Sequence, residues 1–186
     1  MDIQLDRLLA AYCAPALIGI KPANLVACDR ALVPDLPRKL RIYREAFTAR
    51  GVRFEIVCAC ETRYLLLVYH VQSLTRQMCD PRVRRLLSRF GYPDTDGLDA
   101  SLYHLKRRMA QNDGFPHEIG LFLGYPVEDV EGFIEKGGRG CKLTGHWKVY
   151  GDAEAASKQF ERLSRVSRAV TRRVERGESL LEVFAA

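Results

Sequence analysis

Residues 115–150 read FPHEIGLFLGYPVEDVEGFIEKGGRGCKLTGHWKVY, and this stretch decides most of what the sequence predicts. It contains seven of the fourteen glycines, two of the four histidines and the single tryptophan. Glycine allows tight turns and close backbone approach, whereas histidine, lysine and tyrosine side chains bind ligands or move protons. We therefore expect the distinctive chemistry of the protein to lie in this stretch.

Two helices are predicted in the first part of the stretch. Pro116 suits the first turn of a helix, and Ile119 and Phe122 then fall on one face. Pro126 opens a second helix, which Gly137-Gly138 ends with a left-handed exit. The first helix is too short to be stable alone, so its order must come from tertiary packing.

The last part of the stretch alternates between apolar and polar residues. Leu143, Trp147 and Val149 point one way, which predicts that the tryptophan lies in the core. The residues that point the other way are basic or form hydrogen bonds, and the whole run predicts one half-buried strand. They are Lys142, Thr144, His146, Lys148 and Tyr150.

Further strands are predicted outside this stretch. Val52–Cys60 has Phe54, Ile56, Cys58 and Cys60 on one face, and Tyr64–His70 returns as a run that is apolar on both faces. A strand of that kind is usually covered on both sides, so we expect this hairpin to be central. A second hairpin is predicted where two short apolar runs flank a turn. The runs are Ala16–Ile20 and Asn24–Cys28, and the turn is Lys21-Pro22-Ala23.

Helices are predicted where apolar residues recur every three or four positions. One helix is capped by Asp2 and ended by Pro15, and another is capped by Asp35, with Leu36, Leu40, Tyr43 and Phe47 on its inner side. A helix near Leu98–Met109 is stopped by Asn112-Asp113-Gly114, and a long helix covers about 152–176. Hairpins mixed with helices predict an α+β fold. We expect one domain, residues 1–186, with a mainly antiparallel or mixed sheet built from two hairpins plus a late strand and covered by several helices.

Composition places the chain among globular proteins with anionic partners. It has 186 residues, 47% of them hydrophobic and 28% charged, and a net charge of +6. The N-terminus lacks the pattern of a secretory signal, and the longest apolar run, Tyr64–Val71, is far too short to span a bilayer. We expect a cytoplasmic protein without membrane contact, whose six cysteines are free thiols.

Two motifs resemble a known family. PHEIGLFLGYPVEDVEGFI followed by GHWKVY, together with the N-terminal YCAPALIGIKPANL, is similar to bacterial domain-of-unknown-function family 3793, found mostly in anaerobes. The resemblance covers nearly the whole chain but implies no activity, cofactor or catalytic residue. One departure is His146, where the resemblance implies an aromatic residue before Trp147, so His146 is a poor candidate for an essential catalyst.

His117 and Glu118 are the strongest candidates for a site. They lie in the first turn of a predicted helix, where backbone N–H groups favour anions and a histidine can act as a neutral acid or base. The alternative is that Glu118 merely complements the helix dipole and His117 is an ordinary surface residue. Adjacent helical residues do not face each other, so the two are not a ready-made dyad.

An anion-binding face is the second feature. Lys142, Lys148 and Tyr150 share one side of the predicted strand, and Lys21 is a possible addition; a solvated outer face is the alternative. Zinc-ligand spacing is absent, so Cys58 is expected to be a small hydrophobe rather than a metal ligand. We expect no metal, and the sequence names no cofactor.

Two functions remain open. The first is binding of a small anionic metabolite or cofactor, with or without catalysis, in a cleft where the Pro116 helix packs on the 143–150 strand with Phe122 and Trp147 in one core. The second is binding of nucleic acid or an acidic protein by a basic stripe on the long helix, although no nucleic-acid motif is present. The stripe comprises Lys158, Arg162, Arg165, Arg172 and Arg176.

Overall fold

The computed structural model of the chain describes residues 2–93, 97–111 and 115–185. The chain forms two compact units: unit 1 comprises residues 1–72 and 163–186, and unit 2 comprises residues 73–162. Both helices and antiparallel strands are present, so the expected α+β fold is confirmed. The predicted helix stop at Asn112-Asp113-Gly114 lies outside the described residues.

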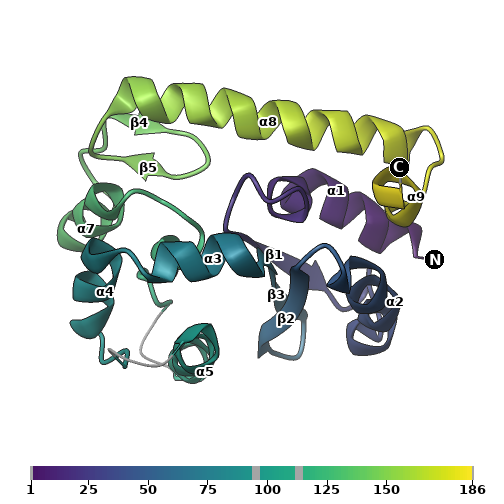
Figure 1. Cartoon of the computed structure of the whole chain (residues 1–186), viewed down its shortest axis with the longest axis horizontal. Helices are drawn as coiled ribbons and strands as arrows, with labels where there is room; N and C mark the ends of the chain where they lie inside the picture. The colour runs from purple at the N-terminus through teal and green to yellow at the C-terminus, as the bar shows by residue number, and fades with distance from the viewer. Residues whose placement is uncertain (1, 94–96, 112–114, 186) are drawn as a thin grey trace. The chain divides into compact units, whose positions relative to one another are not determined.

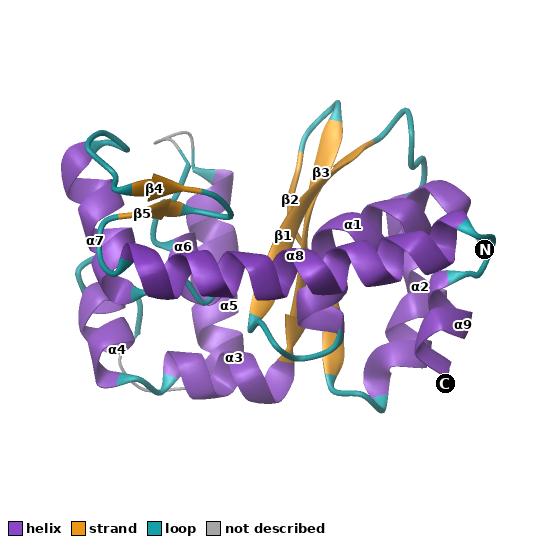
Figure 2. Ribbon diagram, turned by 90° about the horizontal axis from the view of Figure 1, so that it is seen from above, coloured by secondary structure: helices purple, strands orange, loops and turns teal. Residues whose placement is uncertain are grey.

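Unit 1 is built on a three-stranded antiparallel sheet. Its strands are β1 (Ala23–Asp29), β2 (Val52–Ala59) and β3 (Arg63–His70), in the order β1-β3-β2 (Figure 2). The predicted hairpin of β2 and β3 is confirmed, and β3 is the central strand. Leu66, Leu67 and Val68 are fully buried, as expected for a strand that is apolar on both faces.

The predicted hairpin of Ala16–Ile20 and Asn24–Cys28 is wrong, because residues 16 and 17 belong to a helix. α1 runs from Ile3 to Leu17 and continues through Pro15, while β1 pairs with β3. A proline inside a helix removes one backbone hydrogen bond, but its neighbours here are completely buried and hold the helix in place. The Asn24 side chain accepts a hydrogen bond of 3.1 Å from the Ala16 backbone N–H, which further anchors the end of α1.

The predicted alternation along β2 is interrupted by a bulge. The pairing with β3 shifts between Ile56 and Cys58, so that Val57 is buried while Cys60 is exposed. An extra residue in one strand of an antiparallel pair moves the following side chains to the other face. Phe54 and Cys60 therefore do not share one buried face.

Helix α2 (Leu36–Thr48) follows the predicted pattern closely. Leu36, Leu40, Tyr43 and Phe47 are all buried. The Tyr43 hydroxyl donates a 2.7 Å hydrogen bond to the buried carboxylate of Asp6 on α1, which ties the two helices together. Asp35 does not cap α2, because its backbone is left-handed (φ 54°) instead of the extended form that an N-cap needs.

The long helix is α8 (Ala153–Glu175), close to the predicted range, and its residues from 163 onward belong to unit 1. Val170 and Val174 enter the same core as α1, α2 and the sheet. The chain then forms α9 (Leu180–Ala185), which contacts α1 near the C-terminus (Figure 1). Leu180 and Phe184 of this helix are buried in the core of unit 1.

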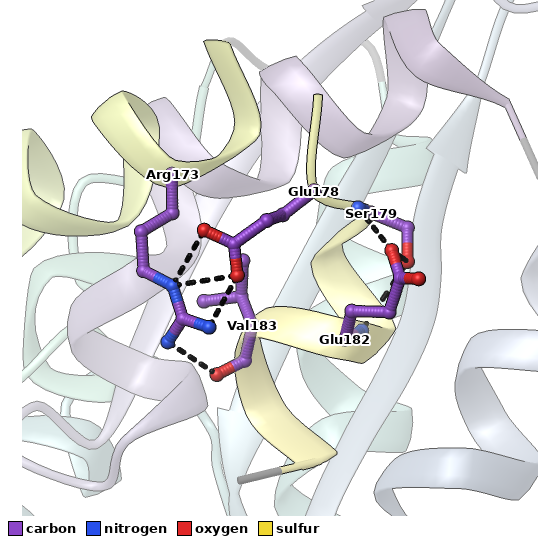
Figure 3. Close-up of polar contacts among 5 residues, drawn as sticks. All are labelled: Arg173, Glu178, Ser179, Glu182 and Val183. Atoms are coloured by element: carbon purple, nitrogen blue, oxygen red, sulfur yellow. Dashed lines mark hydrogen bonds and ion pairs between the residues drawn. The ribbon is translucent and has the colours of Figure 1, made fainter. Parts of the chain in front are cut away.

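Polar contacts fix α9 in place (Figure 3). The Arg173 guanidinium binds the Glu178 carboxylate and donates a 3.1 Å hydrogen bond to the Val183 carbonyl. Ser179 and Glu182 form a reciprocal capping box: the Ser179 N–H donates to the Glu182 carboxylate (2.8 Å), and the Glu182 N–H donates to the Ser179 hydroxyl (3.2 Å). Such contacts satisfy the orphan groups of a helix too short to form alone.

Unit 2 consists mainly of helices and contains one short hairpin among its described residues. The predicted helix after Pro126 is confirmed as α7, with Gly137 (φ 59°) and Gly138 (φ 80°) providing its left-handed exit. Gly120 allows α6 to approach α7, because an added Cβ there would lie 2.9 Å from Val130 Cγ2. The helices are α3 (Val71–Met78), α4 (Pro81–Ser88), α5 (Gly97–Ala110), α6 (Ile119–Phe122) and α7 (Val127–Lys136), followed by the first part of α8.

The predicted strand at 143–150 is wrong in form, because it folds back on itself. β4 (Leu143–Thr144) pairs antiparallel with β5 (Lys148–Val149), and the Gly145 N–H bonds the Trp147 carbonyl in the turn. Gly145 makes this turn possible, since an added Cβ would lie 2.2 Å from the Phe160 ring. Val149 and Trp147 are buried nonetheless, so the prediction that the tryptophan lies in the core is confirmed.

The buried carboxylate of Asp129, in the first turn of α7, holds this hairpin. Its Oδ2 accepts a 2.7 Å hydrogen bond from the Trp147 indole N–H. Its Oδ1 accepts hydrogen bonds from the backbone N–H groups of Tyr150 (2.7 Å) and Gly151 (2.8 Å). Helix α7 thus contacts both β5 and α6, whereas Trp147 stacks on Tyr125 and packs edge-on against the Phe160 ring.

None of the helices in the described parts of the chain combines the length and the apolar character needed to cross a membrane.

We predict that Asp129→Asn destabilises unit 2 and disturbs the environment of Trp147. An amide can accept at only one of the two positions, so at least one buried donor loses its partner, at a cost of roughly 1–3 kcal/mol. Chemical unfolding followed by the fluorescence of Trp147, the single tryptophan, measures both effects. Glu128→Gln removes a neighbouring exposed charge and is the control; an equal loss of stability in both variants would contradict the assignment.

Candidate functional site

Unit 2 contains a buried carboxylate beside a pocket. Glu118 is only 1% exposed, and its Oε1 accepts hydrogen bonds from the Tyr92 hydroxyl (3.2 Å) and from Arg108 Nε. Arg108 is the ion-pair partner that a buried carboxylate requires, and its own side chain is 32% exposed. Burial and the adjacent carboxylate raise the pKa of Tyr92, so this phenol stays protonated and remains a donor.

Glu118 reaches this position through a tight turn rather than a helix. Backbone hydrogen bonds run from Ile119 N to Pro116 O and from Gly120 N to His117 O, and α6 begins only at Ile119. The predicted helix start at Pro116 is therefore wrong. A helix of four residues has almost no dipole, so the expected anion binding at its N-terminus has no basis, and Glu118 acts through Arg108 and Tyr92 instead.

A pocket of about 230 Å³ opens beside this pair. Its lining has an apolar part, formed by aromatic and aliphatic side chains, and a polar part, here called the polar wall, which carries a guanidinium, an amide, an imidazole and a carboxylate. The His117 ring is exposed and packs edge-on against Phe133 at 4.9 Å. The lining residues are Phe90, Arg108, Gln111, Phe115, Pro116, His117, Glu118 and Ile134.

The polar wall retains unused hydrogen-bonding capacity. Among residues 2–93, 97–111 and 115–185, the terminal nitrogens of Arg108 and the Oε2 of Glu118 have no hydrogen-bond partner, because their contacts involve Nε and Oε1. A guanidinium can grip a planar carboxylate or a phosphate with two N–H groups at once. The site can therefore bind a small polar ligand without breaking its own ion pair.

The predicted basic residues of the hairpin lie apart from this pocket. Lys148 approaches the same Phe133 ring as His117, but its Nζ donates a 2.7 Å hydrogen bond to the Gly138 carbonyl. Lys142 Nζ donates to the Gly151 carbonyl at 2.8 Å. The Tyr150 hydroxyl is buried and has no hydrogen-bond partner within the described residues. None of these three residues lines the pocket.

Lys21 belongs to unit 1 and is not among the residues that line the pocket. It is 5% exposed, and its backbone N–H donates to the Pro15 carbonyl, which folds the residue back onto the end of α1. Burial lowers the pKa of Lys21 to about 8, and the nearby Cys13 thiol partly opposes this effect. Lys21 thus lies in a different unit from Lys142, Lys148 and Tyr150, and its pairing with them in one pocket stays a prediction.

The basic stripe is a solvated helix face. All five of its residues are exposed; four lie on α8, and Arg176 directly follows its last residue. Lys158 donates a 2.6 Å hydrogen bond to Glu154 one turn away. In the described residues, no group of three or more His, Cys, Asp or Glu side chains is placed to hold a metal ion.

Sequence reasoning missed Arg108, Gln111 and Tyr92. A signal for Arg108 was present, because it follows Leu105 by three residues and so falls on the same side of α5 as the buried Leu102 and Leu105. A charged residue on an apolar helix face requires a buried partner of opposite charge. That partner, Glu118, lies ten residues further along the chain, beyond the end of α5, so no local pattern could identify it.

We predict that Lys21→Met is more favourable for stability at pH 7 than at pH 10, by up to about 3 kcal/mol. The unfolded chain holds this proton up to a pKa of about 10.5, and the folded chain only up to about 8. Burial of the charged Lys21 therefore destabilises the folded wild-type protein by its full amount below pH 8. Between about pH 8 and 10.5 the unfolded state binds more protons than the folded state, so this destabilisation disappears as the pH rises.

Urea unfolding of both proteins at pH 7 and at pH 10 measures this difference. Groups other than Lys21 titrate equally in the two proteins, so their effects cancel. The prediction is wrong if the stability of Lys21→Met relative to the wild-type protein does not fall at the higher pH.

Comparison with known proteins shows to which family the chain belongs. No curated protein and no solved structure matches the chain. A family model described as "Protein of unknown function (DUF3793)" matches residues 9–184, nearly the whole chain, in agreement with the resemblance of the two sequence motifs. The chain therefore belongs to this family of proteins of unknown function.

Proposed function

We propose that the protein binds a small metabolite carrying an anionic group in the pocket between Arg108 and His117. The observation that carries this proposal is a guanidinium held in a pocket with its terminal nitrogens unpaired among the described residues. Glu118 and the ring of Phe90, whose centroid lies 5.4 Å from the Arg108 guanidinium carbon, fix the position of this side chain. A pre-positioned arginine loses little entropy when it binds a carboxylate or phosphate.

The size and walls of the pocket restrict the ligand. Its volume of about 230 Å³ is below the roughly 300–1,000 Å³ typical of pockets for drug-sized ligands, so a dinucleotide or haem does not match it. Phe90, Phe115 and Ile134 supply apolar contact, while His117 and Gln111 add hydrogen-bonding groups. A compact molecule with one acidic end and one apolar end matches these features.

The pocket has more support than the basic stripe of α8. A row of exposed charges attracts any polyanion, but it fixes no orientation and excludes no water. The stripe is also diluted by acidic neighbours such as Glu154, which already engages Lys158. The proposed ligand is a metabolite of the cytoplasm, a location that the six free cysteines support because such thiols persist in reducing compartments.

We predict that 4-methylpentanoate, 3-phenylpropanoate or glycerol 3-phosphate raises the melting temperature, with a dissociation constant measurable by titration calorimetry. Arg108→Lys should weaken binding by about 1.5–3 kcal/mol, because an ammonium replaces the planar fork. His117→Ala should weaken binding while leaving stability nearly unchanged, since this ring is exposed.

Arg107→Lys is the matched control, because Arg107 is the exposed neighbour of Arg108 on the same helix. It should bind as the wild-type protein does. The proposal fails if none of the three probes stabilises the protein at concentrations well above plausible dissociation constants, or if Arg107→Lys weakens binding as much as Arg108→Lys.

A further inference from the structure

The ion pair at the pocket presents a donor and an acceptor side by side. Arg108 uses Nε and Glu118 uses Oε1 for their mutual contact, and Tyr92 also donates to Oε1. Glu118 Oε2 and the terminal nitrogens of Arg108 are thus left without a hydrogen-bond partner among the described residues, and both side chains line the pocket. A ligand in this pocket would lie beside both a carboxylate and a guanidinium.

The charges of the wall decide which ligand matches it. Glu118 neutralises Arg108, so a ligand with only a negative charge gains attraction from the guanidinium but places its charge close to the carboxylate. A buried acceptor that faces a ligand without a donor also stays unpaired, which reduces affinity. A ligand with an ammonium group beside its carboxylate satisfies both side chains.

We propose that the pocket binds free amino acids with apolar side chains, and that Glu118 is the residue that selects them over other carboxylates. The α-carboxylate accepts hydrogen bonds from the terminal nitrogens of Arg108, and the α-ammonium donates to Glu118 Oε2. The side chain lies against Phe90, Phe115 and Ile134, the apolar wall of the pocket. This assignment rests on the proposed function, since it names the ligand class of the same pocket.

Three matched ligands test the assignment on the unmodified protein. Leucine carries both charges, 4-methylpentanoate lacks the ammonium, and 3-methylbutan-1-amine lacks the carboxylate; phenylalanine, 3-phenylpropanoate and 2-phenylethylamine form a second series. Titration calorimetry at pH 7 should show that at least one amino acid binds ten times or more tighter than both of its analogues, since each analogue leaves one charged group of the wall unmatched.

The variant Glu118→Gln tests the role of the carboxylate, with Glu135→Gln on the exposed end of α7 as the control. Glu118→Gln should reduce the preference for the amino acid over the carboxylate analogue at least tenfold, whereas Glu135→Gln should preserve it. Circular dichroism and the melting temperature show whether Glu118→Gln folds. If it does not fold, the two ligand series on the unmodified protein decide the question.

The outcomes separate this inference from the proposed function. If 4-methylpentanoate or 3-phenylpropanoate binds as tightly as its amino acid, the inference is overturned and anion binding stands. If the amines bind as tightly as the amino acids, the guanidinium does not hold the carboxylate and the inference is overturned. If no amino acid and no carboxylate or phosphate probe binds, both proposals fall.

Discussion

A charge removed from water must be matched by hydrogen bonds or an opposite charge, and this constraint organises unit 2. Glu118 and Asp129 are 1% and 3% exposed, and each draws together parts of the chain that are far apart in sequence. Glu118 joins the turn before α6 to Arg108 on α5 and to Tyr92. Asp129 joins α7 to the hairpin that follows it. Without these partners both carboxylates would be expelled to the surface, and the segments they hold would lose their positions.

The two carboxylates differ in the hydrogen-bonding capacity that their partners leave unused. Asp129 has both oxygens engaged by three N–H donors, which is the pattern of a purely structural group. Glu118 concentrates its contacts on one oxygen and lines a pocket, so it has capacity to meet a ligand. The same pairing that makes its burial tolerable also holds Arg108 in place, and structural and binding roles are therefore carried by one ion pair.

The same need to pair buried polar groups operates at the ends of helices in unit 1. Asn24 binds a backbone N–H of α1 next to Pro15, and Arg173 binds a carbonyl at the end of α9. These side chains satisfy backbone groups that a short or interrupted helix leaves unpaired. Apolar residues such as Leu180 and Phe184 then enter the core without the cost of burying orphan polar groups.

The sequence by itself determined the elements whose burial repeats along the chain. Leu36, Leu40, Tyr43 and Phe47 defined α2, and the turn residues Pro126 and Gly137 bounded α7, because a 3.6-residue period and its breakers are local properties. The central position of β3 also followed from its own composition. The location of His117 and Glu118 at a pocket was likewise accessible from residue types in one short stretch.

Tertiary structure decided what depends on contacts between distant residues. The alternation of apolar and polar residues at 143–150 fits a single strand and a tight hairpin equally well. The hydrogen bonds that the indole and backbone N–H groups donate to Asp129 hold the hairpin form. Pro15 lies inside α1 because burial and Asn24 outweigh one lost backbone bond. Arg108 lines the pocket because it pairs with a carboxylate ten positions away, whereas the Lys142 and Lys148 ammonium groups are bound by the carbonyls of Gly151 and Gly138 and do not line it. Such pairings depend on distances between residues that are far apart in sequence, and the periodicity of the sequence does not encode these distances. Sequence reasoning therefore identified the stretch that contains His117 and Glu118. The fold decided which residues line the pocket with them.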